Sequence, residues 1–540
     1  MGFDQFTAPQ APVVKTTAHP PRATRSPRKL WIITGLALIA VAAFYAIVFS
    51  IHWPFKKQAL IDVLQERSHR SVTIARFRVT YLPPGCVAEG ITFLRYKHKN
   101  QPPLITIQQL AISVTYPTLL LFQHRLDSVR VTGLHLIVPA NEPPGNPSPM
   151  LLLTPSASES SLPIGRLDAT GSLFEFYRGN DPQPLRVAFN RLSAQHVSTR
   201  TTIRYLAELS NSEVPGLIRL QGLLGPWDAK QTANTPVRGK FTYDHGDLSP
   251  IQAVSGTLFS RGAFNGTLGA IRITGSAQVQ NFAVHGSSHA RALAVNYKVT
   301  VNATNGSIGL ETITAAFERS RVLLSGSISA AHPHDGEIAS IQLSSNQARI
   351  EDLLELFISS KEPPMTGDVS FGAHFGLPPE YQSFIRDMKL SGNFGIAGSK
   401  FTNQSTEAGL TKLSQTSEAG KQEKSQHNVA MVLSDLRGQA TVTGGIAHLS
   451  HVEFHIPGAD ARLSGTYSLR TFQADFAGTL MTSGNVSDTQ TGAKSLFLKA
   501  LTPFLKHHDK VKIIPFKITG PYGHTTTSLD LGHNSHRIYY

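Results

Sequence analysis

A long segment without charge near the N-terminus constrains this chain more than any other feature. Residues 31–51, WIITGLALIAVAAFYAIVFSI, contain no Asp, Glu, Lys or Arg and are long enough to cross a bilayer as a helix. A cleaved signal peptide usually has a shorter apolar region followed by small residues at the cleavage site, and the residues after this segment, WPFKK, do not fit that pattern. The sequence therefore predicts one uncleaved transmembrane helix over residues 30–53.

Basic residues flank this segment unequally. They are Arg22, Arg25, Arg28 and Lys29 before it, and Lys56 and Lys57 after it. Because cytoplasmic flanks carry the excess of Lys and Arg, this bias predicts a cytoplasmic N-terminus and export of the chain that follows. Residues 1–29 contain five prolines and are expected to form a disordered cytoplasmic tail.

The net charge of +14 is concentrated near the two ends of the chain. Residues 1–29 carry +4, residues 30–130 carry +7 and residues 491–540 carry +5, so the middle is close to neutral. A nucleic-acid-binding protein would gather its basic residues in one stripe with aromatic residues between them, so a nucleic-acid partner is not expected. Both ends are suited to an anionic membrane surface, although ordinary solvated charges explain them equally well.

Beyond the predicted span the hydrophobic period becomes two, which is typical of half-buried β-strands. The alternating apolar residues include Phe77, Val79, Tyr81, Leu185, Val187, Phe189, Ile271, Ile273, Val322 and Leu324. Asn305-Gly306 separates two such runs and predicts a hairpin. Roughly 20–25 strands of ordinary length would account for the rest of the chain.

Helical patterns are few, at residues 55–68, 348–360, 377–388 and 494–505. So many strands could form several sandwiches, a barrel or one long open sheet. Sandwiches should show domain linkers, and an outer-membrane barrel would need aromatic girdles. The predicted fold is therefore mainly β: a transmembrane helix followed by a long, twisted antiparallel β-sheet curled into an open groove, with a few short helices.

Several segments resemble the AsmA family of envelope proteins. They are VTIARFRVTYLPPGCVAEGITFLRY at 72–96, IQQLAISVTY at 107–116, LSGNFGIAGSKFTN at 390–403, HVEFHIPGADARLSGTYSL at 451–469 and TGAKSLFLKALTPF at 491–504. The resemblance implies an N-terminal β-groove region over residues 54–360 and an AsmA-like C-terminal β region over 361–540, with a flexible insertion near 403–428. It also implies a single-pass protein of the bacterial inner membrane, with most of the chain in the periplasm.

The same resemblance implies that the groove is lined by apolar side chains and binds or channels phospholipid, as in bridge-like lipid-transfer proteins. Period-two patterning alone fits equally a sheet packed against another sheet. The expected groove-lining residues near the membrane are Ile105, Ile107, Leu110, Ile112, Val114, Leu134, Leu136 and Val138. The residues expected to contact phosphate headgroups are Lys56, Lys57, Arg67 and Arg70, for which a solvated helix face is the alternative.

Signatures of common enzymes are missing from the sequence, which contains no G-x-S-x-G, H-E-x-x-H or G-x-x-x-x-G-K-[ST]. His448, His451 and His455 form the densest histidine group, but no cysteine or carboxylate cluster completes a ligand set, so neither a metal nor another cofactor is expected. Cys86 is the one cysteine, which excludes an intramolecular disulfide. It fits a small buried apolar residue, with a free thiol as the other reading. An enzyme is therefore not expected.

Two functions remain in view. The first is phospholipid transfer between the inner and outer membranes, which would contribute to outer-membrane biogenesis. Its partners would be the inner-membrane bilayer, phospholipid and, at the far end, outer-membrane components. The alternative is an assembly or scaffold factor that influences outer-membrane protein insertion without carrying lipid.

Overall fold

The computed structural model describes most of the chain beyond the predicted span. The described residues are 38–41, 43–44, 53–95, 102–121, 123–139, 162–177, 183–251, 253–284, 287, 289–329, 338–356, 362–363, 365–378, 383–402, 434–456, 459–482, 512–521 and 526–529. The chain divides into two units, Met1–Leu60 and Ile61–Tyr540. The second unit contains every strand described below.

In the first unit, residues 38–41 and 43–44 are helical. The predicted tail 1–29 and most of the predicted span 30–53 lie outside the described residues. Among the residues that are described, no helix has the length and apolar character needed to cross a bilayer. The predicted transmembrane helix therefore stays a prediction.

The helices are few and short. They are α2 (Lys57–Ser68), α3 (Tyr116–Leu120), α4 (Ile350–Glu355), α5 (Phe384–Asp387) and the 3-10 turn η2 (Thr232–Asn234). Helix α2 matches the pattern at 55–68, and its apolar residues Leu60, Ile61 and Leu64 are half-buried. Helix α5 lies within the pattern at 377–388, of which Leu377 belongs to β16 and residues 379–382 lie outside the described residues. The pattern at 494–505 lies outside the described residues.

Strands make up most of the described chain. They are β1 (Val72–Tyr81), β2 (Pro84–Phe93), β3 (Ile105–Ser113), β4 (Leu126–Val138), β5 (Ile164–Phe176), β6 (Leu185–Val197), β7 (Ile203–Asn211), β8 (Leu217–Leu224), β9 (Pro236–Asp247), β10 (Val254–Thr267), β11 (Ala270–Val284), β12 (Arg291–Val301), β13 (Ile308–Phe317), β14 (Ser320–Ile328), β15 (Ala339–Arg349), β16 (Met365–Leu377), β17 (Lys389–Phe401), β18 (Ser434–Thr443), β19 (Ile446–Ile456), β20 (Ala459–Ser468), β21 (Gln473–Thr482), β22 (Lys512–Pro521) and β23 (Thr526–Leu529). The mainly β prediction is confirmed.

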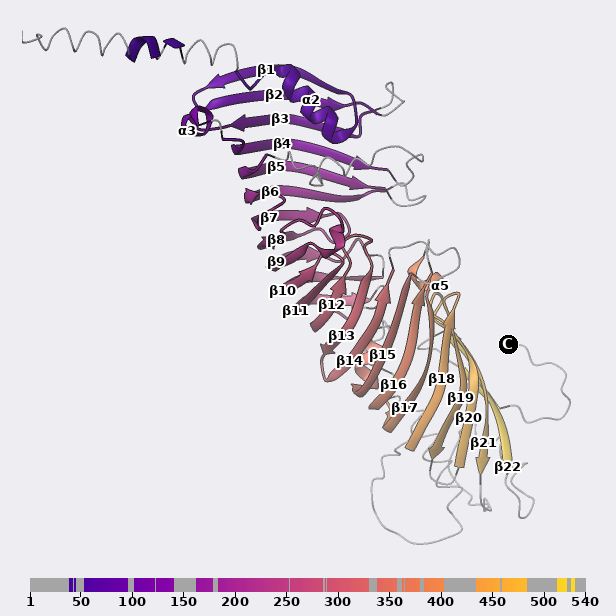
Figure 1. The fold of residues 1–540 in the computed structure, drawn as a ribbon. Coiled ribbons are helices and arrows are strands. Elements are labelled where there is room, and N and C mark those ends of the chain that lie inside the picture. The colour runs from indigo at the N-terminus through magenta and orange to yellow at the C-terminus, as the bar shows by residue number, and fades with distance from the viewer. Residues whose placement is uncertain are drawn as a thin grey trace, which may run out of the picture. The chain divides into compact units, whose positions relative to one another are not determined.

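All of these strands belong to one sheet of 23 strands, in which each strand pairs with the next along the chain (Figure 1). Among the described residues β1 pairs only with β2 and β23 only with β22, so the sheet is open. The strand direction turns progressively along the sheet, as expected from the right-handed twist of strands (Figure 1).

One pairing departs from the antiparallel prediction. Strands β4 and β5 run parallel, with Leu126 opposite Ile164 and Val138 opposite Phe176. The segment between them, residues 139–163, is long enough to return the chain to the starting end of β4, which a short hairpin cannot do. The expectation of an antiparallel sheet is therefore wrong at this single junction, and the remaining pairings are antiparallel.

Local turn chemistry agrees with the sequence at the predicted hairpin. Val301 pairs with Ile308, and Gly306 in the turn has a φ of 75°, which glycine adopts without steric cost. The sheet continues across the predicted boundary between residues 360 and 361, because β15 pairs directly with β16. The predicted insertion 403–428 lies outside the described residues, between β17 and β18, which also pair directly. The predicted domain division stays a prediction.

The tightest core of the second unit lies in β1–β4. The side chains of Ile91, Phe93, Ile105 and Leu136 are at most 1% exposed. A single layer of strands cannot bury both sides of such residues, so a cover is needed. At the end of helix α2, Ser68 is 2% exposed and Arg70 just after it is 4% exposed, so this end of the helix is packed within the second unit.

The alternation of buried residues changes phase within these strands. On β2 the buried residues are Cys86 and Ala88 on one side of Gly90, and Ile91 and Phe93 on the other. Gly90 has a φ of 63°, a left-handed conformation that exchanges the faces of the residues before and after it. Gly133 on β4 has the same φ and the same effect. The apolar residues on both sides of these glycines therefore share one face.

The buried position of Phe93 gives a stability prediction. Replacing Phe93, 0% exposed, with alanine should lower the free energy of unfolding of the full-length chain by about 3–5 kcal/mol, because the cavity cannot fully collapse. Leu206→Ala, at a side chain 47% exposed, should change it by less than ~0.5 kcal/mol. Urea titration followed by circular dichroism measures both, and equal effects of the two substitutions would contradict the assignment of the core.

Candidate functional site

The candidate site is one face of the sheet, and it is apolar from end to end. Cross-strand register places one residue from each of β1–β22 side by side in a line that we call the apolar row. Its members, in order from β1, are Phe77, Ala88, Leu110, Val131, Ala169, Leu192, Ala207, Leu220, Phe241, Gly262, Gly275, Tyr297, Ile313, Leu324, Leu343, Ala373, Gly392, Ala440, Leu449, Gly465, Phe476 and Ile518. At about 4.8 Å per strand the row follows a path of roughly 100 Å.

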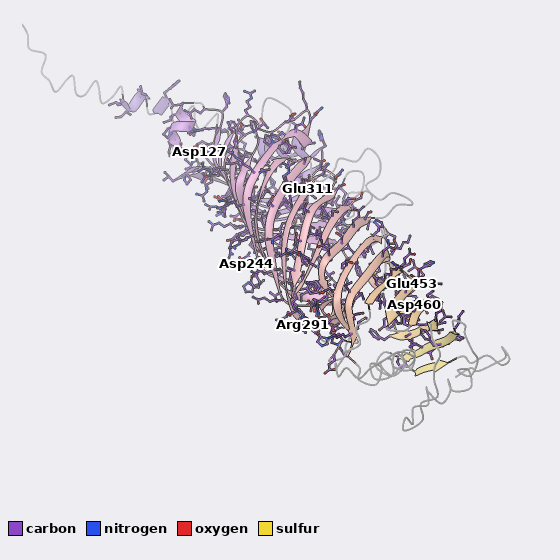
Figure 2. All side chains as sticks on the ribbon, turned by 90° about the horizontal axis from the view of Figure 1, so that it is seen from below. Asp127, Asp244, Arg291, Glu311, Glu453 and Asp460 are labelled. Carbon is purple, nitrogen blue, oxygen red and sulfur yellow. The ribbon has the colours of Figure 1, made fainter. Side chains whose placement is uncertain are left out.

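The degree of burial changes along the row. Ala88, Leu110, Ala169 and Ala207 are at most 8% exposed, whereas every member from Leu220 on β8 to Ile518 on β22 is only half-buried. The described strands all belong to the same sheet, so none of them forms a second layer over this face. Figure 2 shows side chains projecting from both faces along the length of the sheet. Before β8 the row is half-buried only at Phe77, Val131 and Leu192, and from β8 to β22 it is half-buried at every strand.

Aromatic rings on this face lie against glycines of the neighbouring strand. A Cβ atom added to Gly262 would lie 2.7 Å from Phe241, and one added to Gly239 would lie 2.5 Å from Phe264. The same close approach recurs in the pairs Gly275 with Tyr297, Gly438 with Phe394, Gly465 with Phe476, and Gly478 with Phe516. Because each ring occupies the place of a missing side chain, it covers backbone and rises little above the sheet. The result is a low apolar floor.

The tyrosines on this face keep their hydroxyl groups within the protein. Tyr297 Oη lies 2.7 Å from Ser260 Oγ, which in turn donates to the Ser276 carbonyl at 3.1 Å. Tyr243 donates to the Val214 carbonyl. Since buried or half-buried hydroxyls need partners, these bonds remove the polar tips from the surface that a ligand would meet. Burial also raises the pKa of Tyr297 above its ordinary value.

Helix α4 lies on the apolar face at one end of β13–β17. Its residues Ile350 and Leu353 pack against the buried cluster of Ala348, Val369, Ile396 and Leu436. Leu353 also contacts a second cluster, formed by Phe317, Val322 and Leu356. The helix therefore covers one end of the apolar strands and leaves the middle of the row, such as Leu343, half-buried.

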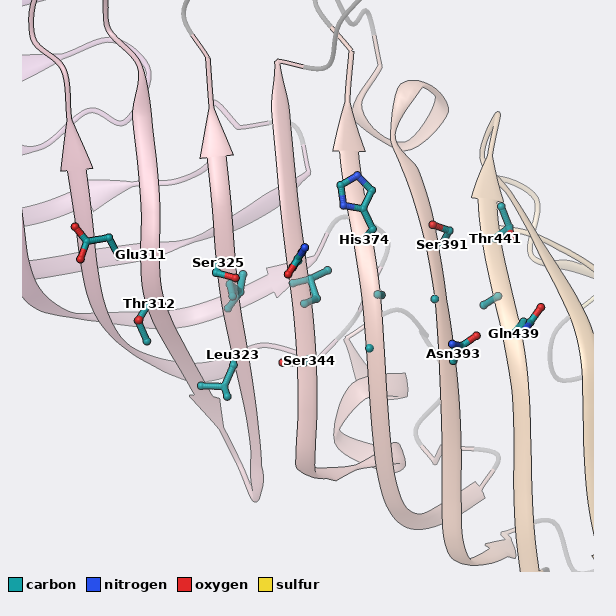
Figure 3. Close-up of a pocket in the computed structure, with 17 residues that line it drawn as sticks. Glu311, Thr312, Leu323, Ser325, Ser344, His374, Ser391, Asn393, Gln439 and Thr441 are labelled. Carbon is teal, nitrogen blue, oxygen red and sulfur yellow. The ribbon is translucent and has the colours of Figure 1, made fainter. Parts of the chain in front are cut away.

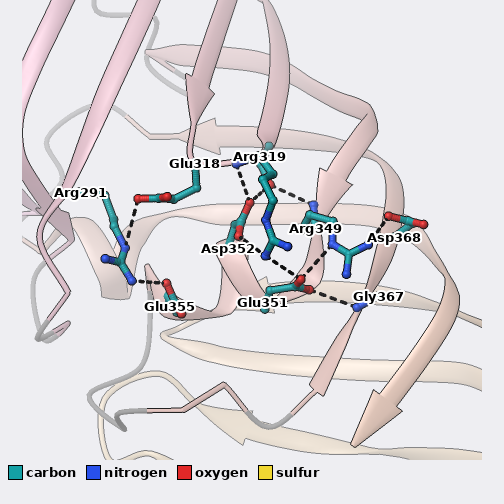
Figure 4. Close-up of polar contacts among 10 residues, drawn as sticks. Arg291, Glu318, Arg319, Arg349, Glu351, Asp352, Glu355, Gly367 and Asp368 are labelled. Carbon is teal, nitrogen blue, oxygen red and sulfur yellow. Dashed lines mark hydrogen bonds and ion pairs between the residues drawn. The ribbon is translucent and has the colours of Figure 1, made fainter. Parts of the chain in front are cut away.

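Two buried carboxylates hold α4 in place (Figure 4). Glu351, 6% exposed, accepts hydrogen bonds from Arg349 Nε at 2.8 Å, from an Arg319 guanidinium nitrogen at 2.9 Å and from the Gly367 amide at 3.1 Å. Asp352, 5% exposed, accepts from Ser320 Oγ at 2.8 Å and from the Arg319 amide at 3.0 Å. These bonds connect the β13–β14 turn to β16 through the helix.

The carboxyl group of Glu351 is ionised in this network. Burial by itself raises the pKa, but the backbone amides of Glu351 and Gly367 and the Arg349 side chain favour the charged form and bring the pKa below the ordinary value of 4.5. Removing one partner would leave a buried charge unpaired, which is strongly destabilising. The network therefore has a structural role at the edge of the apolar face.

A pocket of about 810 Å³ lies over β13–β18 (Figure 3). Its walls are two rows of mainly polar residues that flank the apolar row: Leu323, Ser344, Gly372, Asn393 and Gln439 on one side, and Ser325, Gln342, His374, Ser391 and Thr441 on the other. Because side chains alternate along a strand, the residues before and after each member of the apolar row point to the face opposite that row. The lining also includes Leu324, Leu343, Ala373, Gly392 and Ala440 of the apolar row, so the pocket contacts residues of that row as well as the mainly polar rows beside it.

This polar pocket lacks an evident catalytic pair among its described residues. Glu311, at one end, accepts a hydrogen bond from Thr300 Oγ1 at 2.6 Å and lies 2.8 Å from Lys298 Nζ. The hydrogen bond from Lys298, together with that from Thr300, lowers the pKa of Glu311 to about 2. A carboxylate held so firmly in its ionised form is a poor general base near neutral pH.

The structure brings together the predicted groove-lining residues but buries most of them. Ile105 pairs with Leu136 and Ile107 with Leu134. The six residues Ile105, Ile107, Leu110, Val114, Leu134 and Leu136 are at most 7% exposed. Ile112 and Val138 are half-buried. In this structure the six residues belong to the packed core. Ile112 and Val138 are more accessible and fit contact with a ligand better. The lining role of the whole set stays a prediction.

The predicted headgroup residues differ in accessibility. Lys56 and Lys57 are exposed and Arg67 is half-buried, whereas Arg70 is only 4% exposed. A buried guanidinium cannot reach a headgroup in this conformation, so only the first three fit the predicted role. Cys86 is 2% exposed, as expected for a small buried residue, and burial raises the pKa of its thiol to about 11.

The histidine group does not converge on one point. His455 pairs with Asp460, and His451 has a φ of 51° at an irregularity of β19. Among the described residues no group of three or more His, Cys, Asp or Glu side chains is placed to hold a metal ion.

No protein-family model matches the chain, and no curated protein matches it.

The α4 network gives a pH prediction. Because the folded pKa of Glu351 is depressed, its stabilising contribution is complete above the ordinary value of 4.5 and is lost as the pH falls through the lower folded pKa. Glu351→Gln should lower the free energy of unfolding at pH 7 by about 2–3 kcal/mol and flatten its dependence on pH below 4.5. Urea titrations at several pH values measure both effects.

The matched control is Asp368→Asn, at a side chain 74% exposed that pairs with Arg349 alone. It should change the free energy of unfolding by less than ~1 kcal/mol. If Asp368→Asn and Glu351→Gln gave the same pH profile, the proposed role of the buried carboxylate would be wrong.

Proposed function

We propose that this chain is a single-pass inner-membrane protein of the AsmA type, whose periplasmic sheet curls into an open groove and carries phospholipid toward the outer membrane. The observation that carries the proposal is the apolar row, which runs without a charged residue from Phe77 on β1 to Ile518 on β22. Apolar surface of this extent is rare on a soluble protein that has no apolar ligand or partner.

Hydrocarbon is the occupant that the row suits best. Each methylene group of an acyl chain costs about 0.8 kcal/mol in water, so a lipid leaving a bilayer needs continuous apolar contact. The low floor made by Phe241 on Gly262 and Phe264 on Gly239 offers such contact without side chains that stand across the path. The zwitterionic or anionic headgroup would remain in water outside the groove.

The register of the strands supports a sheet that curves into a groove. Every pairing from β9–β10 to β16–β17 contains a register shift of the kind produced by a β-bulge. Bulges bend a strand and increase its twist. Phe371 and Phe394 on the apolar face are half-buried and pack against the clusters that α4 covers.

The proposed membrane anchor is supported by the sequence. The uncharged segment 31–51, with basic residues before it, favours an anchor with a cytoplasmic N-terminus. Helix α2 follows that segment, and its exposed Lys57 and half-buried Arg67 would contact phosphate headgroups. The tightly packed β1–β4 region would then serve as a rigid base, with lipid contact beginning where burial decreases.

Native mass spectrometry of the full-length protein in mild detergent tests the proposal. The wild type should retain phospholipid. Leu343→Asp, in the middle of the apolar row, should reduce the bound lipid by about tenfold or more, because a carboxylate facing acyl chains costs more than the 1.4 kcal/mol that a factor of ten requires.

Ser344→Asp is the control, since Ser344 is the next residue on the same strand and is exposed on the opposite face. It should bind lipid as the wild type does. A wild type that carries no lipid, yet still supports outer-membrane protein insertion, would favour the scaffold function instead.

A further inference from the structure

The face opposite the apolar row carries a cluster of cations on β7–β13. We call it the basic patch, and its members are Arg204, Arg219, Arg238, Lys240, Arg261, Arg272 and Lys298. All seven side chains are exposed. The same face of these strands carries the carboxylates of Glu208, Asp244, Asp247 and Glu311, so seven positive and four negative charges leave a net charge of +3.

Cross-strand register spaces these cations evenly. Arg204 is opposite Leu223, which is opposite Arg238, and Arg238 is opposite Asn265, which is opposite Arg272. Three arginines of one row therefore alternate with uncharged residues, about 10 Å apart at two strand spacings. Lys240 and Arg261 belong to the next rows on the same face.

The acidic residues neutralise only part of the patch. Arg219 lies 3.4 Å from Glu208 and 2.6 Å from Asp244, and Glu311 lies 2.8 Å from Lys298 and 3.6 Å from Arg272. The other four side chains, Arg204, Arg238, Lys240 and Arg261, form no ion pair or side-chain hydrogen bond with any residue that the structure describes. The free charge is thus concentrated on adjacent strands in the middle of the patch.

The composition of the patch favours a membrane surface over a folded protein as its partner. Protein interfaces usually contain a desolvated centre rich in aromatic residues and methionine. On β7–β9 the apolar side chains on this face are Leu206, Leu217 and Leu223, and the one phenylalanine on this face of β10, Phe259, is half-buried against the His245 ring. Arginine and lysine bind phosphate groups without a shaped interface, and each adds to the attraction of an anionic leaflet.

We propose that the basic patch docks onto the headgroups of an anionic phospholipid surface, with the apolar row facing away from that surface. The patch begins about 30 Å along the sheet from β1, so this contact is separate from any headgroup contact of α2. It does not depend on lipid occupying the apolar face. It would hold the middle of the sheet beside a bilayer.

Vesicle capture tests the docking surface. The full-length protein is embedded in nanodiscs of phosphatidylcholine and mixed with separate vesicles of phosphatidylcholine alone or of phosphatidylcholine with phosphatidylglycerol. Capture by the anionic vesicles should exceed capture by the neutral ones, and it should fall as salt is raised. The combined variant Arg204→Gln, Arg238→Gln, Lys240→Gln and Arg261→Gln should lose about tenfold or more of that capture.

Arg437→Gln with Arg462→Gln is the control, because these exposed arginines lie on the same face of β18 and β20 and share Glu453. This control should be captured as the wild type is, and circular dichroism should show both variants folded. Equal capture of neutral and anionic vesicles, or undiminished capture of the four-residue variant, would overturn the proposal. Binding of soluble polyglutamate in preference to anionic vesicles would overturn it in favour of an acidic protein partner.

Discussion

A sheet of one layer must place most of its large apolar side chains on one face, and this constraint governs the whole second unit. Because side chains alternate along each strand, a slip of one residue in any pairing would transfer a strand's apolar set to the opposite face. The register avoids this at every junction from β1 to β22, including the parallel pairing of β4 with β5, where Val131 still meets Ala169. Continuity of the apolar row therefore depends on register more than on any single residue.

Such a sheet also has to remain stable where no described strand covers its apolar face. Part of the answer is lateral packing: Phe241 fills the space beside Gly262, and Phe264 fills the space beside Gly239. Contact between neighbouring strands thus buries some of the ring surface that a second layer would otherwise bury. The remaining apolar surface, on half-buried residues such as Leu343, is available to an external hydrocarbon.

Much of the fold could be predicted from the sequence, because period-two patterning is a local signal. The runs around Phe77, Ile112, Val187 and Ile273 all became strands, and few helices formed. The parallel junction could not be predicted in this way, since strand direction depends on how the chain crosses residues 139–163, and the pattern of side chains is the same in either direction.

The candidate site was harder to place. The residues selected near the membrane, such as Ile105 and Leu136, have the right alternation, but alternation does not reveal whether a cover exists. The floor made by rings over glycines was missed because it depends on which residues face each other across strands. A usable signal was present: glycines and aromatic residues recur at spacings of two, as in Phe264 after Gly262. The salt-bridge network of α4 joins residues far apart in sequence, such as Arg319 and Glu351, and has no local signal.

The central claim is that hydrocarbon contacts the apolar face and water contacts the opposite face. Spin labels at two adjacent positions test it most directly, one at Ala440→Cys on the apolar row and one at Thr441→Cys on the polar face. Accessibility to oxygen and to a water-soluble nickel chelate would be measured on the lipid-loaded, full-length protein, in which Cys86 is buried. The account predicts that the label at 440 favours oxygen and the label at 441 favours the chelate. Preference for the chelate at both positions would contradict it.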